Sequence, residues 1–208
     1  MLASASPARL ETLRRAGLRP VVVVSDVDED AFSAPDVIAL AGVLARAKAE
    51  AVAAQLPRHG SGPAPAGAST TLVVGCDSLL ELDGRALGKP GSAAAAASRW
   101  REMRGRSGHL HTGHHVISVA RNQVRSAGAV ATTTVEFADL SDAEIEAYAA
   151  TGEPERVAGA FTIDGLGGAF VTSITGDPHN VVGISLPLLR RLFAGLDVAW
   201  PDLWHNGA

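Results

Sequence analysis

The sequence predicts an α/β protein built on a mixed, twisted sheet with flanking helices. Signals for helices alternate with signals for strands along the chain, which is typical of α/β architecture. Residues 79–82 and 85–87, with Asp83-Gly84 between them, have the pattern of a β-hairpin. Because hairpin strands are antiparallel, we expect the sheet to be mixed rather than wholly parallel.

Capping residues and apolar periodicity predict five helices. Ser6 as N-cap and Gly17 beyond the last periodic residue delimit the first helix. The second is a long Ala-rich segment with apolar residues at helical spacing, and Ser92 caps the third. Ser141 and Glu144 have the spacing of a capping box at the fourth. The expected helices cover approximately residues 7–16, 35–55, 92–103, 141–150 and 186–193.

Runs of β-branched and apolar residues between these helices predict the strands. The first long run ends at Gly75-Cys76-Asp77-Ser78, so we expect Asp77 at the tip of a strand, where catalytic residues are often found. Two later strands are expected to join near Asn122. Residues 57–69 consist mainly of Pro, Gly, Ser and Ala, which predicts a mobile surface loop. The expected strands are 21–24, 71–74, 79–82, 85–87, 116–119 and 130–137.

Length and composition restrict the classes of protein that fit the chain. Its 208 residues suit a single domain over residues 1–208, and 47% hydrophobic residues supply a sizeable core. A formal net charge of -4 without a long basic run argues against nucleic acid or an anionic membrane as a partner. Cys76 is the only cysteine, and we see neither a signal peptide nor an apolar stretch of spanning length. We therefore expect a cytoplasmic protein.

The segment from Ser4 to Arg9 could bind a phosphate group. Its small side chains let a ligand approach the backbone, and the free amides at the following helix start favour an anion. Arg9 could add a charged hydrogen-bond donor. An ordinary capped helix explains the same segment, and from local chemistry alone that interpretation has more weight.

Asp77 and Lys89 form a second candidate site. An Asp exposed by a tight turn could bind a divalent cation or orient a water molecule, and Lys89 could balance phosphate charge. This is not a Walker loop, because Pro90 stands where that motif needs Ser or Thr. Lys48 and Lys89 are the only lysines among 18 Lys and Arg residues, a weak hint of specific roles. A turn residue and a solvated charge explain Asp77 and Lys89 about equally well.

Four of the seven histidines lie between His109 and His115, so a zinc site has to be considered. A regular strand would place His109, His111 and His115 on one face and His114 on the other. Neighbouring rings on one face of a strand diverge unless a bulge intervenes. Solvated or core-edge histidines are therefore favoured over a zinc site.

Several specific blocks occur in a fixed order along the chain. They are Leu2-Ala3-Ser4-Ala5-Ser6-Pro7, Ser25-Asp26-Val27-Asp28-Glu29, Ala45-x-x-Lys48-Ala49, Val74-Gly75-Cys76-Asp77-Ser78, Leu87-Gly88-Lys89-Pro90, Gly105-x-x-Gly108 with His111-Thr112-Gly113, Gly152-Glu153-Pro154, Ala158-Gly159-Ala160-Phe161-x-Ile163-x-Gly165-Leu166-Gly167 and Asn180-Val181-Val182-Gly183. In this order they resemble the Maf family of nucleoside triphosphate pyrophosphatases. The similarity runs from Leu2 to about Leu192 and leaves out residues 57–69 and the C-terminal tail.

The resemblance implies a fold like that of Maf proteins and inosine triphosphatases, with an active-site cleft between two lobes and often a homodimer. It implies hydrolysis of a nucleoside triphosphate to the monophosphate and pyrophosphate with Mg²⁺ or Mn²⁺. The expected role is the clearing of non-canonical or modified nucleotides. Two other readings stay open: a nucleotide-binding regulator of septum formation with little catalysis and, more distantly, a zinc hydrolase built on the histidines.

The resemblance also assigns residues. Asp77 matches the catalytic Asp and, with Glu29, would hold the metal and position a water molecule for attack at the α-phosphorus. The cationic residues would stabilise the phosphoryl oxygens and the leaving pyrophosphate. The expected substrate-binding residues are Ser4, Ser6, Arg9, Glu29, Lys48 and Lys89.

Three positions depart from the family pattern and concern base specificity. Ala8 stands where an Arg is usual, Ser78 replaces a Thr, and Asp164 replaces the Gln that is typical of pyrimidine-specific members. An ionised Asp164 only accepts hydrogen bonds, which matches the adjacent N–H donors of guanine better than the pairing edges of uracil and thymine. The sequence therefore predicts a preference for guanine-type triphosphates over UTP and dTTP.

Overall fold

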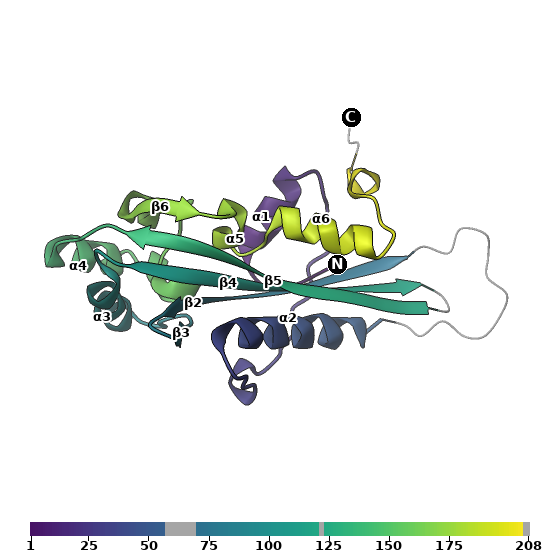
Figure 1. Cartoon of the computed structure of the whole chain (residues 1–208), viewed down its shortest axis with the longest axis horizontal. Helices are drawn as coiled ribbons and strands as arrows, with labels where there is room; N and C mark the ends of the chain where they lie inside the picture. Colours follow the sequence, from purple (N-terminus) through teal and green to yellow (C-terminus); the bar gives the residue numbers. More distant parts are fainter. Residues whose placement is uncertain (57–69, 121–122, 206–208) are drawn as a thin grey trace.

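A six-stranded sheet extends along the long axis of the molecule (Figure 1). The structure is a computed structural model that describes residues 1–56, 70–120 and 123–205. The expected surface loop at 57–69 and the expected joint near Asn122 lie outside these residues. The strands are β1 (Leu2–Ala3), β2 (Thr71–Leu82), β3 (Arg85–Leu87), β4 (Ser107–Ala120), β5 (Gln123–Phe137) and β6 (Val171–Thr175).

The sheet is mixed, as the sequence predicts. Its order is β1-β2-β4-β5-β6, and the short β3 pairs with β2. β1 runs parallel to β2, whereas the other pairings are antiparallel, including the expected hairpin of β2 and β3. β4 is longer than expected because the histidine-rich residues 107–115 continue the strand.

The five predicted helices begin within two residues of their expected starts, whereas α5 (Pro178–Val182) was not predicted. The Oγ atoms of Ser6, Ser92 and Ser141 each accept a hydrogen bond from the backbone N–H three residues ahead. Glu144 also accepts the N–H of Ser141, which completes the capping box. Within the part of the chain described, no helix combines the length and the apolar character needed to cross a membrane. The α-helices are α1 (Pro7–Arg15), α2 (Val37–Ala53), α3 (Ala93–Met103), α4 (Asp142–Ala150), α5 (Pro178–Val182) and α6 (Leu186–Gly195).

Side chains of β2 alternate between two layers of the protein. Figure 1 shows α2 on one side of the sheet and α5 and α6 on the other. Gly75 faces α2 so closely that a Cβ atom there would lie 2.2 Å from the carbonyl oxygen of Ala45. Its neighbours Val74 and Cys76 pack in the opposite layer, in a cluster with Leu189 of α6. Because successive residues of a strand face opposite ways, Asp77 points to the α2 side.

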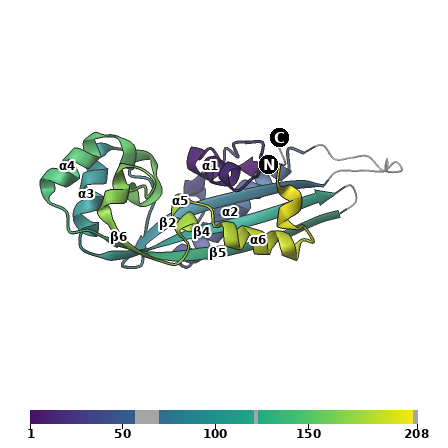
Figure 2. The same cartoon turned by 90° about the horizontal axis from the view of Figure 1, so that it is seen from above.

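Two kinds of hydrophobic core fill the two ends of the sheet. Figure 2 shows α3 and α4 at one end, and α1, α2 and α6 at the other. We call the first the aromatic end, because Trp100 makes edge contacts with three rings at centroid distances of 5.6 to 5.8 Å: Phe137, Tyr148 and Phe170. We call the second the aliphatic end, and it comprises three clusters. The first contains Leu13, Val74 and Leu189, the second contains Ala49 and Val73, and the third contains Ala41 and Leu44.

Besides β4, four of the predicted strands were wrong in their extent, and one of these is β5, which begins at Gln123 rather than at residue 130. Residues 21–24 form a single bridge between Val22 and Leu2 rather than a strand, because β1 is only two residues long and offers little to pair with. The predicted strands at 71–74 and 79–82 are one continuous strand, β2. Gly75 therefore permits the close approach of α2 instead of ending the strand. Asp77 lies within β2 and not at a strand tip.

Candidate active site

Asp77 lies at a gap in one edge of the sheet. β4 pairs with one side of β2 from Thr71 to Glu81. On the other side, β1 reaches only Val74 and Gly75, and β3 begins its pairing at Leu80. Among the described residues, no strand pairs with residues 76–79 on that side. This part of β2 is therefore paired with a strand on one side only.

Lys48 brings two carboxylates together beside this gap. It is buried on α2, and its Nζ donates hydrogen bonds to Oδ1 of Asp77 and, at 2.6 Å, to Oε1 of Glu29. Glu29 begins a short 3₁₀ helix, η1 (Glu29–Ala31), in the acidic segment before α2. Lys48 is thus a shared hydrogen-bond donor to the two carboxylates.

The two carboxylates differ in proton affinity because they differ in exposure. Burial raises the pKa of Asp77 above its ordinary value, and the charges of Lys48 and Arg9 oppose this shift without cancelling it. Burial would also raise the pKa of Glu29, but the hydrogen bond and charge of Lys48, with smaller effects of Lys89 and Arg9, hold it below its ordinary value. Asp77 is therefore the better proton acceptor of the pair, while Glu29 stays anionic.

Arg9 forms a second, buried cationic centre next to Asp77. Its Nε donates to the carbonyl oxygen of Gly183 at 2.8 Å. Nη1 and Nη2 donate to Oγ of Ser4 and Oγ of Ser78, each at 2.9 Å. The guanidinium plane is therefore held by groups from the segment between β1 and α1, from β2 and from the C-terminal end of α5. A neutral set of partners leaves its positive charge available to an anion.

Three residues behind Arg9 were not identified from the sequence as part of the site. Gly183 has φ +114°, and a Cβ atom there would lie 3.1 Å from Nε of Arg9. Thr112 shares a hydrogen bond of 2.9 Å with Ser78 and donates to the carbonyl oxygen of Asn180 at 3.0 Å. The Asn180-Val181-Val182-Gly183 and His111-Thr112-Gly113 blocks contain these residues, but their roles depend on contacts that cross the sheet.

The structure brings six predicted residues together in two adjoining groups. The first contains Glu29, Lys48 and Asp77, and the second contains Ser4, Arg9 and Ser78. The groups adjoin because Asp77 and Ser78 are consecutive in β2.

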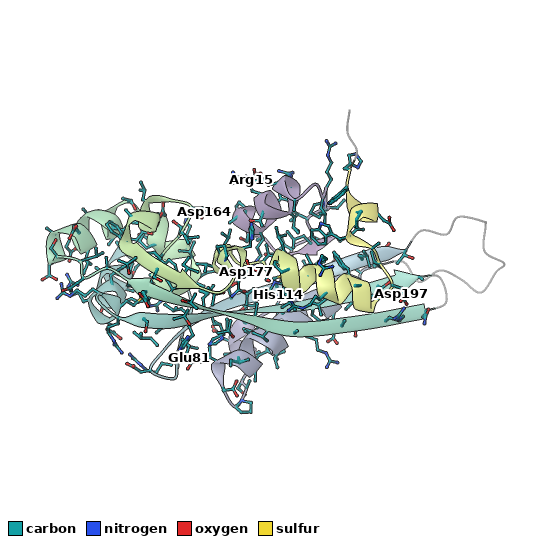
Figure 3. The ribbon with its side chains drawn as sticks, turned by 45° about the horizontal axis from the view of Figure 1, so that its top comes forward. Arg15, Glu81, His114, Asp164, Asp177 and Asp197 are labelled. Atoms are coloured by element: carbon teal, nitrogen blue, oxygen red, sulfur yellow. The ribbon has the colours of Figure 1, made fainter. Side chains whose placement is uncertain are left out.

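The other predicted residues are less closely engaged. Lys89 is exposed but near enough to lower the pKa of Glu29. The Oγ of Ser6 caps α1 by accepting the N–H of Arg9, so the capped-helix interpretation is confirmed for this residue. Ala8 is half-buried in the first turn of the same helix. Asp164 is exposed, and Figure 3 places it away from α2, on the part of the chain that includes the aromatic end.

The donor set fits a hard divalent cation. Asp77 and Glu29 supply carboxylate oxygens, which Mg²⁺ and Mn²⁺ prefer, and a Mg²⁺ site commonly uses one or two carboxylates with substrate phosphates completing the shell. Among the described residues, no group of three or more His, Cys, Asp or Glu side chains could enclose a metal without substrate. Asp77 and Glu29 would therefore hold such an ion together with the substrate.

The histidines of β4 point to opposite layers instead of converging. His111 binds Thr132 through Nδ1 at 2.8 Å and Glu81 through Nε2 at 2.9 Å. His114 contacts the carbonyl oxygen of Thr112 through Nδ1, and its Nε2 accepts the N–H of Ser185 at the start of α6. Burial lowers the pKa of His114 to about 4, so this ring is neutral at pH 7. Figure 3 shows Glu81 and His114 well separated.

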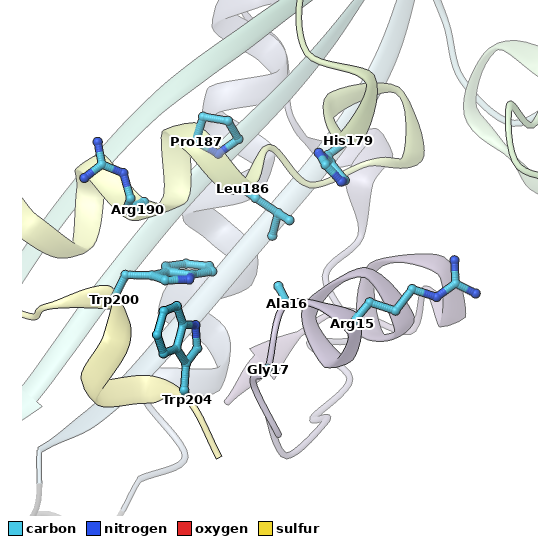
Figure 4. Close-up of a pocket in the computed structure, with 9 residues that line it drawn as sticks. All are labelled: Arg15, Ala16, Gly17, His179, Leu186, Pro187, Arg190, Trp200 and Trp204. Atoms are coloured by element: carbon cyan, nitrogen blue, oxygen red, sulfur yellow. The ribbon is translucent and has the colours of Figure 1, made fainter. Parts of the chain in front are cut away.

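A hollow of about 650 Å³ lies apart from these groups, between the end of α1 and the start of α6 (Figure 4). Trp200, Trp204 and Leu186 form apolar walls, and none of the predicted site residues lines it. Asp77 and its neighbours remain the candidate active site, because none of the residues that line the hollow is a buried charged group that could act on a phosphate.

The remaining feature is Glu153, which in the sequence stands out only as part of the Gly152-Glu153-Pro154 block. Its carboxylate accepts hydrogen bonds from Tyr148, Thr162, Leu166 and Gly167. Its neighbours in the sequence gave no signal of this role, because three of the four donors come from residues 162–167.

The fold and these groups define a class of protein: an α/β enzyme with paired carboxylates and buried cations suited to phosphate chemistry. The chain belongs to the Maf family, since the model of Maf-like proteins matches residues 1–196. It is 55% identical over 207 residues to the nucleoside triphosphate pyrophosphatase of Salinispora tropica, which covers 100% of this chain and 88% of that protein. It is 52% identical over 208 residues to the enzyme of the same name from Cutibacterium acnes, over 99% of this chain and 94% of that protein. The Streptomyces coelicolor enzyme of that name is 52% identical over 204 residues, or 98% and 93% of the two chains.

Proposed function

We propose that the protein hydrolyses nucleoside triphosphates to monophosphates and pyrophosphate. The observation that carries this proposal is the convergence of Asp77 and Glu29 on Lys48, beside the buried guanidinium of Arg9. Such an arrangement binds a polyanion and offers a carboxylate of raised pKa near it. The shared name of the relatives supports the same reaction.

In this mechanism the residues divide the work by charge and burial. Asp77 accepts the proton of the attacking water, a role that its raised pKa favours. Arg9 and Lys48 would stabilise the oxygens of the α-phosphoryl group, and exposed Lys89 would approach the leaving pyrophosphate. When bound, a Mg²⁺ or Mn²⁺ ion held by Asp77 and Glu29 would neutralise part of the triphosphate charge.

We further propose that Asp164, with Ala8 and Ser78, influences which base is accepted. Asp164 is exposed, so its carboxylate is accessible to a ligand. The nucleotide would lie between the two ends of the sheet, with phosphates at Asp77 and base toward Asp164. A carboxylate that faces the carbonyl oxygens of uracil would be desolvated without a donor, so guanine-type triphosphates are preferred. Comparing kcat/KM for GTP, 7-methyl-GTP, UTP and dTTP in the wild type and in Asp164→Gln tests this preference. A wild type that favours UTP or dTTP would contradict it.

Asp77→Asn tests the reaction itself. The amide can neither accept the proton nor provide an anionic ligand, so we expect pyrophosphate release to fall by about 10² to 10⁴. The control is Asp30→Asn, an exposed carboxylate in η1 beside Glu29. Retention of more than half the activity in folded Asp77→Asn would remove Asp77 from the mechanism. Binding of triphosphates by the wild type without pyrophosphate release would favour the regulator instead.

Reaction in ¹⁸O-water locates the bond that breaks. Attack at the α-phosphorus places the label in the nucleoside monophosphate, whereas label in pyrophosphate would contradict it.

The cytoplasmic location, the homodimer, the single domain and the role in clearing modified nucleotides stay predictions from the sequence. Light scattering of the purified chain measures the oligomeric state directly.

A further inference from the structure

Glu153 collects four hydrogen bonds on one carboxylate. Its Oε1 accepts from Oη of Tyr148 at 2.9 Å, from Oγ1 of Thr162 at 2.5 Å and from the N–H of Gly167 at 3.0 Å. Its Oε2 accepts from the N–H of Leu166 at 3.0 Å. Two of the donors are backbone amides of the segment that carries Asp164. The carboxylate therefore satisfies the amides of Leu166 and Gly167 at the start of the 3₁₀ helix η4 (Leu166–Phe170).

The segment is packed closely around that carboxylate. A Cβ atom on Gly165 would lie 2.7 Å from Oε2 of Glu153 and 2.5 Å from Oγ1 of Thr162. One on Gly167 would lie 2.4 Å from Oη of Tyr148. Glycine is thus needed at both positions because the chain passes so near to Glu153 and its partners. Asp164 sits between the anchored Thr162 and Leu166, with its own side chain exposed.

Glu153 is itself held by the aromatic end. It begins the short helix η2 (Glu153–Arg156) after Gly152, whose φ is +75°, and Pro154 is buried beside it. Its partner Tyr148 packs edge-on against Trp100 at a centroid distance of 5.7 Å. Burial would raise the pKa of Glu153, but the hydrogen bonds from Thr162, Leu166, Gly167 and Tyr148 hold it below its ordinary value, so the carboxylate stays ionised.

We propose that Glu153 is a positioning residue for base selection, which holds the Asp164 segment against the aromatic end. This inference rests on the proposed nucleotide function, and it adds Glu153 as a residue that acts by positioning Asp164. Glu153 itself has its oxygens occupied by protein donors, so it does not read the base. Its effect appears in discrimination between bases and not in the chemical step at Asp77.

Glu153→Gln is the sharpest change. A glutamine keeps the shape and one carbonyl oxygen, but its NH₂ group cannot accept a hydrogen bond. The amide N–H of either Leu166 or Gly167 then loses its acceptor, while the aromatic end keeps its apolar contacts. Glu155→Gln is the matched control, a carboxylate in the same short helix. Asp164→Ala shows how base discrimination changes when only the proposed contact of Asp164 with the base is lost.

Two measurements follow these variants without turnover. Hydrogen exchange reports the protection of the Leu166 and Gly167 amides. Titration with α,β-methylene analogues of GTP and UTP gives the ratio of their dissociation constants, which does not require hydrolysis. In Glu153→Gln we expect at least one of the two amides to exchange about tenfold faster or more. We expect the binding ratio to fall about tenfold toward that of Asp164→Ala, while Glu155→Gln matches the wild type.

The outcomes separate this inference from the proposed function. A binding ratio in Glu153→Gln within twofold of the wild type would overturn the inference, as would unchanged protection of both amides. Equal ratios in Asp164→Ala and the wild type would also overturn it, because Glu153 would then have no base contact to position. Failure of the proposed function has a different signature, in which the analogues bind but GTP yields no pyrophosphate.

Discussion

The two ends of the sheet share strands β2 and β4 but bury different chemistry. The aromatic end buries Trp100 completely, among rings and aliphatic side chains. The aliphatic end buries Arg9, Lys48, Asp77 and His114 alongside small residues. Large rings fill space and fix positions, whereas small residues let α2 approach the sheet and bring Lys48 to Asp77. One end therefore serves as a rigid support, and the other brings ionisable groups together.

Trp100→Ala tests the supporting end and has the largest expected effect on folding. Removal of the fully buried indole should lower the free energy of unfolding by about 3–5 kcal/mol, measured by urea denaturation. Trp204→Ala is the control, because that side chain is 50% exposed and should cost less than about 1 kcal/mol. The folded fraction of Trp100→Ala should retain a kcat near that of the wild type. If Trp100→Ala lowered the free energy of unfolding no more than Trp204→Ala, the supporting role of the aromatic end would be refuted.

Lys48→Met tests the catalytic end. Methionine preserves most of the length and apolar stem but leaves Asp77 and Glu29 without their shared cation. We expect kcat for pyrophosphate release to fall by about 10² to 10³, as for other lost groups that stabilise charge in the transition state. Arg46→Met, an exposed residue of the same helix paired with Glu50, should have kcat within about twofold of the wild type. Equal activity of the two variants would argue against a phosphate-facing Lys48.

Gly75→Ala tests the close approach that joins α2 to the sheet. The new methyl group would meet the carbonyl oxygen of Ala45 at 2.2 Å, so α2 must move. We expect a loss of about 1–3 kcal/mol in the free energy of unfolding, together with reduced activity as Lys48 shifts. Gly88→Ala is the control, because a Cβ atom there meets no atom within 4 Å among the described residues. A crystal structure of Gly75→Ala with α2 unmoved would contradict this account.

His114 should make the aliphatic end the more acid-sensitive one. Its folded pKa of about 4 lies below the ordinary 6.5, so the unfolded chain binds the proton more readily between these values. The contribution of neutral His114 to the free energy of unfolding is fully present above pH 6.5. It falls by up to about 1.4 kcal/mol per pH unit as the pH drops toward 4. The charges that act on the ring are Arg9, which lowers its pKa, and Asp177, which raises it.

Comparing the wild type with His114→Gln isolates this effect from half-buried His115, whose pKa burial also lowers. The difference in unfolding free energy between the two proteins should shrink from pH 7 to pH 5. Hydrogen exchange at pH 5 should accelerate first at the start of α6, where Ser185 donates to His114. A pH-independent difference would show that the ring is not buried in its neutral form.

Helix ends and turns were predictable from the sequence because they depend on neighbours in the chain. Ser6, Ser92 and Ser141 cap their helices within three residues, and the Asp83-Gly84 turn joins adjacent strands. Residues 21–24 were mispredicted because a strand also needs a partner strand of sufficient length. Their partner, β1, has only two residues. Glu153 escaped notice for the same reason, since three of its four donors lie nine or more residues away.

By itself, then, the sequence determined the fold class, the starts of five of the six described α-helices and six of the residues that meet at the candidate site, but not Thr112, Asn180 or Gly183. Only the tertiary structure decided that β2 continues through Gly75 and that Lys48 meets both Glu29 and Asp77, 19 and 29 residues away. Such meetings depend on how closely α2 can pack on the sheet. Helix caps and turns depend on residues that are neighbours in the chain, so a sequence pattern reveals them. Packing brings together residues that are far apart in the chain, and the sequence pattern does not show which of them will meet.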